Sequence, residues 1–305
     1  MKENTTIINN LSIKKFHNTV KNYLEISKPR SVTLLYFTSL VSILIASSIY
    51  GFSLKKIILI SIAIILGVMG ANAATNYIDR EIDILMERTR KRAIPSGKIS
   101  PPIKGLIFSI IFIVLGIAIA FYINWICAVF LFLGFFDSAI IYNAITKRKS
   151  RLNILYGSFA GGFPVLVGWT AISSGKINLI AIFMFLFVII WTPSHIWSLA
   201  YFYKEDYKKA NIPMLPTFLS DKQNHFLLTS LNILMIIASI LLWYFYKLSL
   251  IYLIITSCFG IVLIVISIIM ILKSSKNLAW VLFKISSPYL AIIFLLLLIE
   301  FLVIK

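Results

Sequence analysis

Long apolar stretches alternate with short polar segments along almost the whole chain. Each stretch is about 20 residues long, the length of α-helix that crosses about 30 Å of membrane hydrocarbon. Few charges interrupt them, which favours membrane-spanning helices over the helices of a soluble core. Nine spans are predicted, at residues 32–50, 57–78, 104–123, 125–145, 153–173, 178–202, 226–246, 249–272 and 285–304. The predicted fold class is therefore all-α, a polytopic membrane protein with nine transmembrane helices in a single bundle.

The composition supports this prediction and excludes a water-soluble fold, because 60% of the residues are hydrophobic, 13% are charged and the mean hydropathy is +0.94. The first 30 residues are polar and basic and lack the apolar core of a signal peptide, so no cleavage is expected. An amphipathic surface helix is predicted over residues 11–27. We accordingly divide the chain into a cytoplasmic N-terminal segment, 1–30, and an intramembrane domain, 31–305.

Basic residues are unevenly distributed between the polar segments. If successive segments lie on alternate sides of the membrane, 24 of the 29 Lys and Arg residues fall on one side. The positive-inside rule then predicts a cytoplasmic N-terminus and a C-terminus outside the cell membrane. The net charge of +18 is explained by this topology and by attraction to anionic lipid head groups. The lipid bilayer is thus an expected partner and nucleic acid is not.

The two cysteines, Cys127 and Cys258, lie inside predicted spans with no second thiol nearby in the sequence. They are expected to be packing residues. They support neither a disulfide framework nor a thiolate metal site.

A stripe of amides and carboxylates follows the end of the second span. Asn72, Asn76, Asp79, Asp83 and Glu87 are spaced 4, 3, 4 and 4 residues apart, so on a continuous helix they share an arc of about 80°. Such oxygen ligands suit Mg²⁺, which takes one or two carboxylates and shares its remaining positions with water and substrate phosphates. The stripe therefore predicts a magnesium site and a phosphorylated substrate.

The basic segment after the stripe supplies the complement of a phosphate. Arg88 and Arg92 are one helical turn apart, with Arg90 and Lys91 between them, and guanidinium groups bind phosphate oxygens in pairs. The alternative is a solvated loop in which charges pair locally, Glu87 with Lys91 for example, and the cations only set the topology. The amides within the stripe favour the site, because unpaired polar groups at membrane depth are costly.

The same segment resembles a known motif. "NYIDREIDILMERTRKRAIPSG", with Ala71 and Asn72 before it, is similar to the first aspartate-rich motif of the UbiA-type intramembrane prenyltransferases, and among them to that of the protohaem IX farnesyltransferases (haem O synthases). Two residues depart from the usual pattern: Thr75 stands where Asn is usual, and Ala93 replaces a Pro.

A second group of polar and aromatic residues lies at the end of the sixth span. Trp191, His195, Phe202 and Asp206 share one helical face, with His195 about 16 Å deeper than Asp206. A lone His in an apolar span is often hydrogen-bonded to a neighbour. Flanked by Trp191 and Trp197, it is instead interpreted as a haem-iron ligand or a haem-positioning group.

The resemblance extends over this second group. "WTPSHIWSLAYFYKEDYKKANIPMLP" is similar to the haem O synthase pattern, with Ser194 and Ile196 as departures beside His195. Further matches are Lys28, Pro29 and Arg30 before the first span, Tyr142, Lys147 and Arg148 before the fifth, and the stretch "GSFAGGFPVLVGW". The resemblance covers residues 28–216; beyond Asp221 only the hydropathy agrees.

The resemblance implies a Mg²⁺-dependent transfer of a farnesyl group from farnesyl diphosphate to a vinyl group of haem B, with water addition, giving haem O. In that interpretation one or two Mg²⁺ ions are held from opposite sides by the two acidic clusters. The implied catalytic residues are Asn76, Asp79, Asp83, Arg88, Arg92 and Asp206. The implied Mg²⁺ ligands are Asn72, Asn76, Asp79, Asp83 and Asp206. Diphosphate is assigned to Arg30, Arg88, Arg92, Lys147 and Arg148, and haem to Trp191, His195 and Trp197.

Two other functions are compatible with parts of the pattern. A UbiA-type enzyme acting on a quinone precursor or a glycerophosphate would share the first site, but the Trp191 and His195 element argues against it. A cation carrier would use the acidic stripe as an ion path, but it has no need of clustered cations beside the acids. A haem A synthase or an oxidase assembly factor is a candidate partner if the product is haem O.

Overall fold

The computed structural model describes residues 17–273 and 275–304, and over this part of the chain it contains helices and no strands. Within the same residues, nine helical segments are long and apolar enough to cross a membrane. They are α2 (Pro29–Tyr50), α3 (Leu54–Ile78), α5 (Ile103–Ile123), α6 (Trp125–Phe135) with π-helix η1 (Phe136–Thr146), α7 (Asn153–Gly157) with α8 (Phe159–Ile172), α9 (Leu179–Phe202), α12 (Asp221–Tyr246), α13 (Leu250–Lys273), and α14 (Lys276–Ile299) with π-helix η2 (Glu300–Ile304). Three short helices, α4 (Arg80–Leu85), α10 (Lys204–Lys209) and α11 (Leu215–Phe218), lie in connecting segments. The predicted all-α class is confirmed.

All nine predicted spans correspond to observed helices, and the differences are at their ends. Side-chain caps fix several of these ends. Asn124 and Asn178 accept hydrogen bonds from the first turns of α6 and α9, and Ser220 and Gln223 form a reciprocal capping box that starts α12. α14 begins at Lys276 rather than at residue 285, because its first turns pack on α9. Trp280 stacks on Phe202, and Phe283 stacks on His195.

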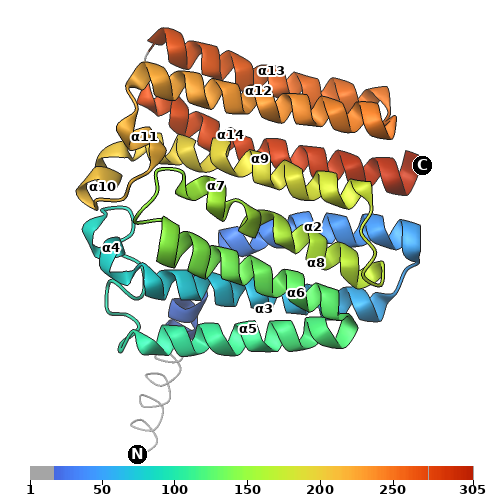
Figure 1. Ribbon diagram of the computed structural model, residues 1–305, viewed down its shortest axis with the longest axis horizontal. Helices are drawn as coiled ribbons and strands as arrows, with labels where there is room; N and C mark the ends of the chain where they lie inside the picture. Colours follow the sequence, from blue (N-terminus) through green and yellow to red (C-terminus); the bar gives the residue numbers. More distant parts are fainter. Residues whose placement is uncertain (1–16, 274, 305) are drawn as a thin grey trace, which may run out of the picture.

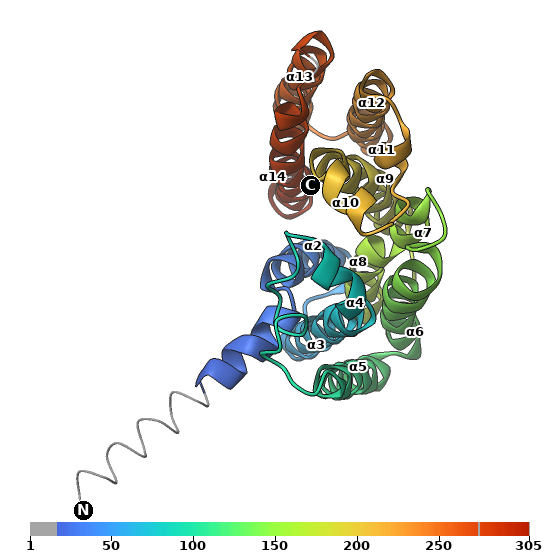
Figure 2. The same cartoon turned by 90° about the vertical axis from the view of Figure 1, so that its left-hand side faces the viewer.

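The spanning helices form two groups. Figure 2 looks along them from the end that carries α4 and α10; helices α2 to α8 lie together below, and α9, α12, α13 and α14 lie above. The groups meet where α8 packs on α9 and where α14 approaches α2 (Figure 1). α12 and α13 are therefore peripheral. Cys258 on α13 is exposed, so its predicted packing role is wrong, whereas Cys127 is buried as expected.

The helix that precedes α2 holds the loop after α4 in place. Residues 17–26 are helical, which confirms that part of the predicted surface helix; residues 11–16 lie outside the described part of the chain. Glu25 forms an ion pair of 3.0 Å with Lys98, and Ile26 is buried against Ala93 in that loop. The N-terminal helix and the loop thus close over the end of α3, where the candidate site begins.

Candidate active site

Asp79 and Asp83 stand at the break between α3 and α4. Asp79 ends α3 and Asp83 follows one turn later on α4, and each residue is only 2% exposed. The helix does not continue to Glu87 as the stripe predicts, because Met86 takes an extended backbone conformation after Leu85. Glu87 is exposed and turned out of the stripe. The two remaining carboxylates are the acidic part of the site.

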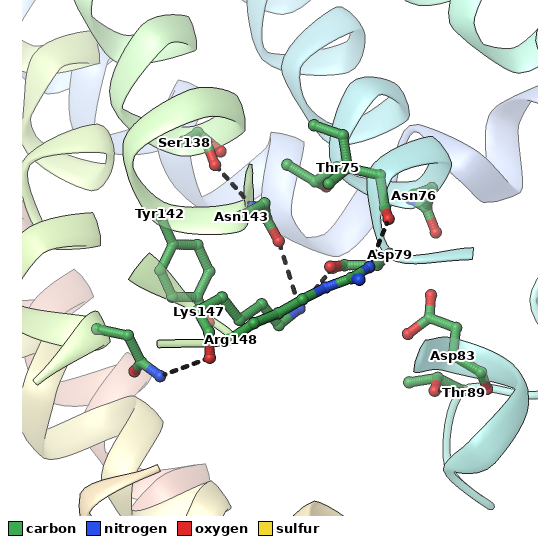
Figure 3. A network of polar contacts seen from close by, with 12 residues as sticks. Thr75, Asn76, Asp79, Asp83, Thr89, Ser138, Tyr142, Asn143, Lys147 and Arg148 are labelled. Atoms are coloured by element: carbon green, nitrogen blue, oxygen red, sulfur yellow. Dashed lines mark hydrogen bonds and ion pairs between the residues drawn. The ribbon is translucent and has the colours of Figure 1, made fainter. Parts of the chain in front are cut away.

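Lys147 joins the end of the fourth span to Asp79. Its Nζ lies 2.5 Å from Asp79 Oδ2 and 3.3 Å from Asn143 Oδ1 (Figure 3). Asn143 lies in η1 and Lys147 caps its end four residues later, so the two side chains meet on one side of the span. Gly157 allows η1 to pack closely on α7, because a Cβ there would lie 2.7 Å from the Tyr142 ring.

Arg92 pairs with the other carboxylate. Its Nη1 lies 2.7 Å from Asp83 Oδ2, and the Thr89 hydroxyl donates to the Asp83 carbonyl oxygen at 3.0 Å. These two contacts fold the loop between α4 and α5 back on itself. The Arg92 guanidinium therefore lies beside α4, the helix that precedes the loop.

Lys28 brings a third cation from the residue before α2. Its Nζ donates a hydrogen bond of 2.8 Å to Thr75 Oγ1 on α3. Burial, and then the nearby guanidinium of Arg92, lower the pKa of Lys28 from 10.5 to about 7. Thr75 is one of the two departures from the usual motif, and in this chain its hydroxyl holds the lysine.

These groups line one cavity. Its charged lining consists of four basic residues, Lys28, Arg88, Arg92 and Lys147, and two acids, Asp79 and Asp83. Two of the cations are already paired with the two carboxylates. The excess of cations makes the cavity suited to a polyanion.

The two carboxylates also fit a magnesium ion. Asp79 Oδ1 is buried and has no hydrogen-bond partner among the described residues, so this oxygen is available to a cation. Across residues 17–273 and 275–304, no three His, Cys, Asp or Glu side chains are grouped to hold a metal by themselves. A pair of carboxylates suits Mg²⁺, because this ion usually takes one or two carboxylates and completes its coordination with water and substrate phosphate.

An apolar hollow adjoins the charged cavity. Ser31, Asn72 and Ser138 line both, and the hollow continues between α2, α3, α6 and α8 past Leu35, Leu131 and Val167. Three glycines, Gly67, Gly134 and Gly161, keep its walls free of side chains. A charged cavity that opens into an apolar hollow suits an amphiphilic ligand with a polyanionic head.

Arg88 separates this cavity from a shallower one at the surface. It lines both, and the outer one also contains Glu87, Glu205 and Asp206. Asp206 Oδ2 accepts a hydrogen bond of 3.4 Å from the backbone N–H of Arg88. The structure therefore does not bring Asp206 into the cavity of Asp79 and Asp83, because Arg88 stands between them; its role as a Mg²⁺ ligand stays a prediction.

Four other predicted residues lie at the edge of the cavity or outside it. Arg30 is exposed and does not line the cavity, and Arg148 is exposed with Nη2 3.3 Å from the Ile78 carbonyl oxygen at the end of α3. The amides of Asn72 and Asn76 donate to the carbonyl oxygens of Ser27 and Ile26, at 2.9 and 2.7 Å. Asn72 lines the cavity and Asn76 does not. Both amides fasten the segment that carries Lys28.

His195 lies between α9 and α14 and does not line the cavity. Its ring stacks on Trp191 at 4.4 Å and on Phe283 at 4.2 Å, and its Nδ1 lies 2.8 Å from Ser286 Oγ. The expectation that Trp197 flanks it is wrong, because residues two apart point about 200° apart on a helix. Trp197 is buried in the main core instead.

From the sequence we did not assign Lys28, Thr75, Tyr142, Asn143 or Tyr207 to the site, and all of them line the cavity. Lys28, Tyr142 and Tyr207 belonged to matching motifs, so a signal existed for these three. Asn143 carries no spacing pattern that separates it from an ordinary polar residue at the end of a span.

The fold and the cavity together fit the class of polytopic membrane proteins that take an amphiphilic ligand, with its polyanionic head group at the end of the bundle and its apolar chain within it. The model of the UbiA prenyltransferase family matches residues 35–297. The chain belongs to the UbiA prenyltransferase family.

Curated relatives of the chain are named protohaem IX farnesyltransferases. The one from Thermoplasma volcanium is 40% identical over 284 residues, covering 92% of this chain and 97% of the relative. The one from Thermoplasma acidophilum is 39% identical over 279 residues, covering 91% and 96%.

Solved structures share the fold at low identity. A structure described as digeranylgeranylglyceryl phosphate synthase gives a TM-score of 0.75 at 21% identity, covering 93% of this chain and 98% of that one. A UbiA homologue from Archaeoglobus fulgidus bound to DMAPP and Mg²⁺ gives 0.63 at 17% identity, covering 90% and 99%.

Proposed function

We propose that the chain transfers a farnesyl group from farnesyl diphosphate to a vinyl group of haem B, and that water addition completes haem O with release of diphosphate. The observation that carries the proposal is the cavity in which Asp79 and Asp83 face an excess of cations and which opens into an apolar hollow. The acceptor rests on the likeness to relatives named protohaem IX farnesyltransferase.

The diphosphate head binds to Lys28, Arg88, Arg92 and Lys147, with Arg30 and Arg148 as further candidates nearer the surface. Asp79 and Asp83 hold Mg²⁺, with Asn72, Asn76 and Asp206 as further predicted ligands. The bound Mg²⁺ stabilises the negative charge that develops on the departing diphosphate. Arg88 and Arg92 share this task, because a guanidinium fork matches the phosphate oxygens.

The farnesyl tail lies in the apolar hollow. When the allylic carbon–oxygen bond breaks, its electron pair leaves with diphosphate and the positive charge stays on the farnesyl carbons. The apolar walls keep water from this cation until the vinyl group attacks it. The attack forms a carbon–carbon bond and moves the positive charge to the carbon beside the porphyrin ring. A water molecule adds there and loses one proton, which leaves the hydroxyethylfarnesyl group.

In this proposal the acceptor approaches from the side of His195 and Trp191; Trp197, on the opposite face of α9, stays a predicted haem residue. The N-terminus is cytoplasmic and the C-terminus lies outside the cell membrane, as the distribution of basic residues predicts. Residues 1–30 form the cytoplasmic segment and 31–305 the enzyme domain. A haem A synthase or an oxidase assembly factor is the class of protein that would receive haem O.

Incubation of the purified protein with haem B, farnesyl diphosphate and Mg²⁺ tests the proposal, with the product identified by mass. We expect haem O, and none when Mg²⁺ is chelated. Parallel incubations replace haem B with 4-hydroxybenzoate or with a prenylated glycerophosphate. A prenylated product from either of these, without haem O from haem B, would refute the acceptor assignment and retain the prenyltransferase.

A further inference from the structure

Five rings form a stacked column at the interface of α9 and α14. In order they are Trp191, His195, Phe283, Trp280 and Phe202. The ring centroids of successive members lie 4.4, 4.2, 5.1 and 5.1 Å apart, with interplanar angles of 21, 28, 19 and 26°. The column runs from the depth of Trp191 to the end of α9, where Phe202 lines the outer cavity beside Arg88.

The side of this column presents ring edges. Four of its members, His195, Phe283, Trp280 and Phe202, are half-buried rather than enclosed in the core. The edge of an aromatic ring is its electropositive part, so a row of edges attracts the electron-rich face of another flat π-system. The column is therefore suited to a large, flat, aromatic ligand that lies along α14.

A lysine stands beside the column in the N-terminal part of α14. Lys284 is exposed, and its Nζ lies 5.7 Å from the centre of the Trp280 ring. It follows the first residue of α14 by eight positions, or about 12 Å along the helix. The six ion pairs found among the described residues do not include it. A cation beside an apolar ring column, with no carboxylate partner among the described residues, is available to an anionic group of a ligand.

A simpler explanation is that Lys284 extends its side chain to the lipid head groups and contributes only to topology. The direction of its side chain, back over Trp280 toward the start of α14, suits both explanations. A role in topology alone would not require the Lys284 ammonium to lie over Trp280, which is a member of the ring column.

We propose that the ring column and Lys284 together bind the porphyrin acceptor, with the macrocycle against the ring edges and a propionate paired with the Lys284 ammonium. This inference rests on the proposed function, since it places the haem of that reaction. In this arrangement Lys284 binds the anionic edge of the ligand, and Trp280 and Phe283 form part of the wall of the binding site. His195, fixed by Ser286, then positions the macrocycle at the deep end of the column.

Binding of iron-free protoporphyrin IX to the full-length protein in detergent tests the inference without any role for iron ligation. The second probe is the dimethyl ester of protoporphyrin IX, in which both carboxylates are neutral. We expect Lys284→Met to weaken binding of the free acid at least about fivefold, the size of a partly desolvated ion pair. Binding of the diester should not change, and Lys284→Arg should restore most of the affinity for the free acid.

Lys273→Met is the matched control, because Lys273 is an exposed lysine at the end of α13 near the start of α14. It should bind both porphyrins as the unmodified protein does. Equal affinity of Lys284→Met and the unmodified protein for the free acid would overturn the inference, as would an equal loss for acid and diester. If the unmodified protein makes haem O and Lys284→Met binds the free acid normally, only this inference fails. If the unmodified protein binds no porphyrin, the proposed acceptor fails as well.

Discussion

Lys147 Nζ lies 2.5 Å from Asp79 Oδ2, although the two residues are 68 positions apart and belong to different spans. The contact brings the π-helical end of the fourth span against the end of α3. An ammonium beside one carboxylate oxygen leaves the other, Asp79 Oδ1, without a partner in the described protein. The pair thus holds a cation suited to a diphosphate and an unpartnered oxygen suited to a metal at adjacent points of one cavity.

If Asp79 holds the metal as proposed, replacing it should lower catalysis without unfolding the protein. Asp79→Asn keeps the size of the side chain and removes its charge, and turnover should fall at least about a hundredfold, as for the loss of one electrostatic contact in a dry site. Glu81→Gln is the control, because Glu81 is exposed and its ion pair is with its neighbour Arg80. Turnover of haem B at saturating Mg²⁺ measures both. Normal turnover in a folded Asp79→Asn protein would contradict the assignment.

Arg92 should matter for the donor and not for the acceptor. Arg92→Lys keeps the charge beside Asp83 but loses the fork that binds two oxygens. We expect KM for farnesyl diphosphate to rise by about tenfold, the effect of one charge-assisted hydrogen bond, while haem affinity is unchanged. Arg90→Lys, on the exposed side of the same loop, provides the control. An equal loss of both affinities would indicate a structural role for Arg92.

The spans and the position of the two aspartates could be predicted from the sequence, because hydropathy and residue spacing depend on local order alone. Contacts between distant segments could not. Nothing in the spacing places Lys28 beside Thr75 or Lys147 beside Asp79, since these pairs depend on how α2, α3 and η1 pack. Glu87 lies elsewhere than the stripe predicts for a related reason: periodicity assumes a continuous helix, and the extended backbone at Met86 ends it.

The ammonium of Lys28 predicts a pH dependence of donor binding. Its pKa of about 7 means that the amine is largely neutral at pH 8 in the unliganded protein. A bound diphosphate favours the protonated form, so binding above pH 7 takes up a proton and affinity falls as pH rises, by at most about tenfold per pH unit. Calorimetry of a thio-substituted farnesyl diphosphate between pH 7.5 and 9 measures this slope. Lys28→Arg stays charged and should show a smaller slope; identical slopes would refute the role of Lys28.

The apolar hollow predicts selectivity for the length of the prenyl chain. Val167 is buried and lines the hollow on the α8 side. It is not one of the residues that the hollow shares with the charged cavity. Val167→Phe should fill part of this space, so that use of farnesyl diphosphate falls about tenfold or more while the shorter geranyl diphosphate is still used. The ratio of kcat/KM for the two donors is the measurement. A parallel loss with both donors would mean that the tail lies elsewhere.

His195 decides whether the deep end of the ring column acts on haem. Its ring is held between Trp191 and Phe283, and its Nδ1 is engaged by Ser286, so an iron ligand would have to be Nε2. His195→Ala should change the visible spectrum of bound haem B or abolish its retention, whereas Mg²⁺-dependent binding of farnesyl diphosphate should persist. Ser286→Ala keeps the imidazole and removes its hydroxyl partner, so a smaller spectral change is expected. A His195→Ala protein that binds haem with an unaltered spectrum and still makes haem O would exclude this residue from the acceptor site and leave the ring edges and Lys284 as its remaining candidates.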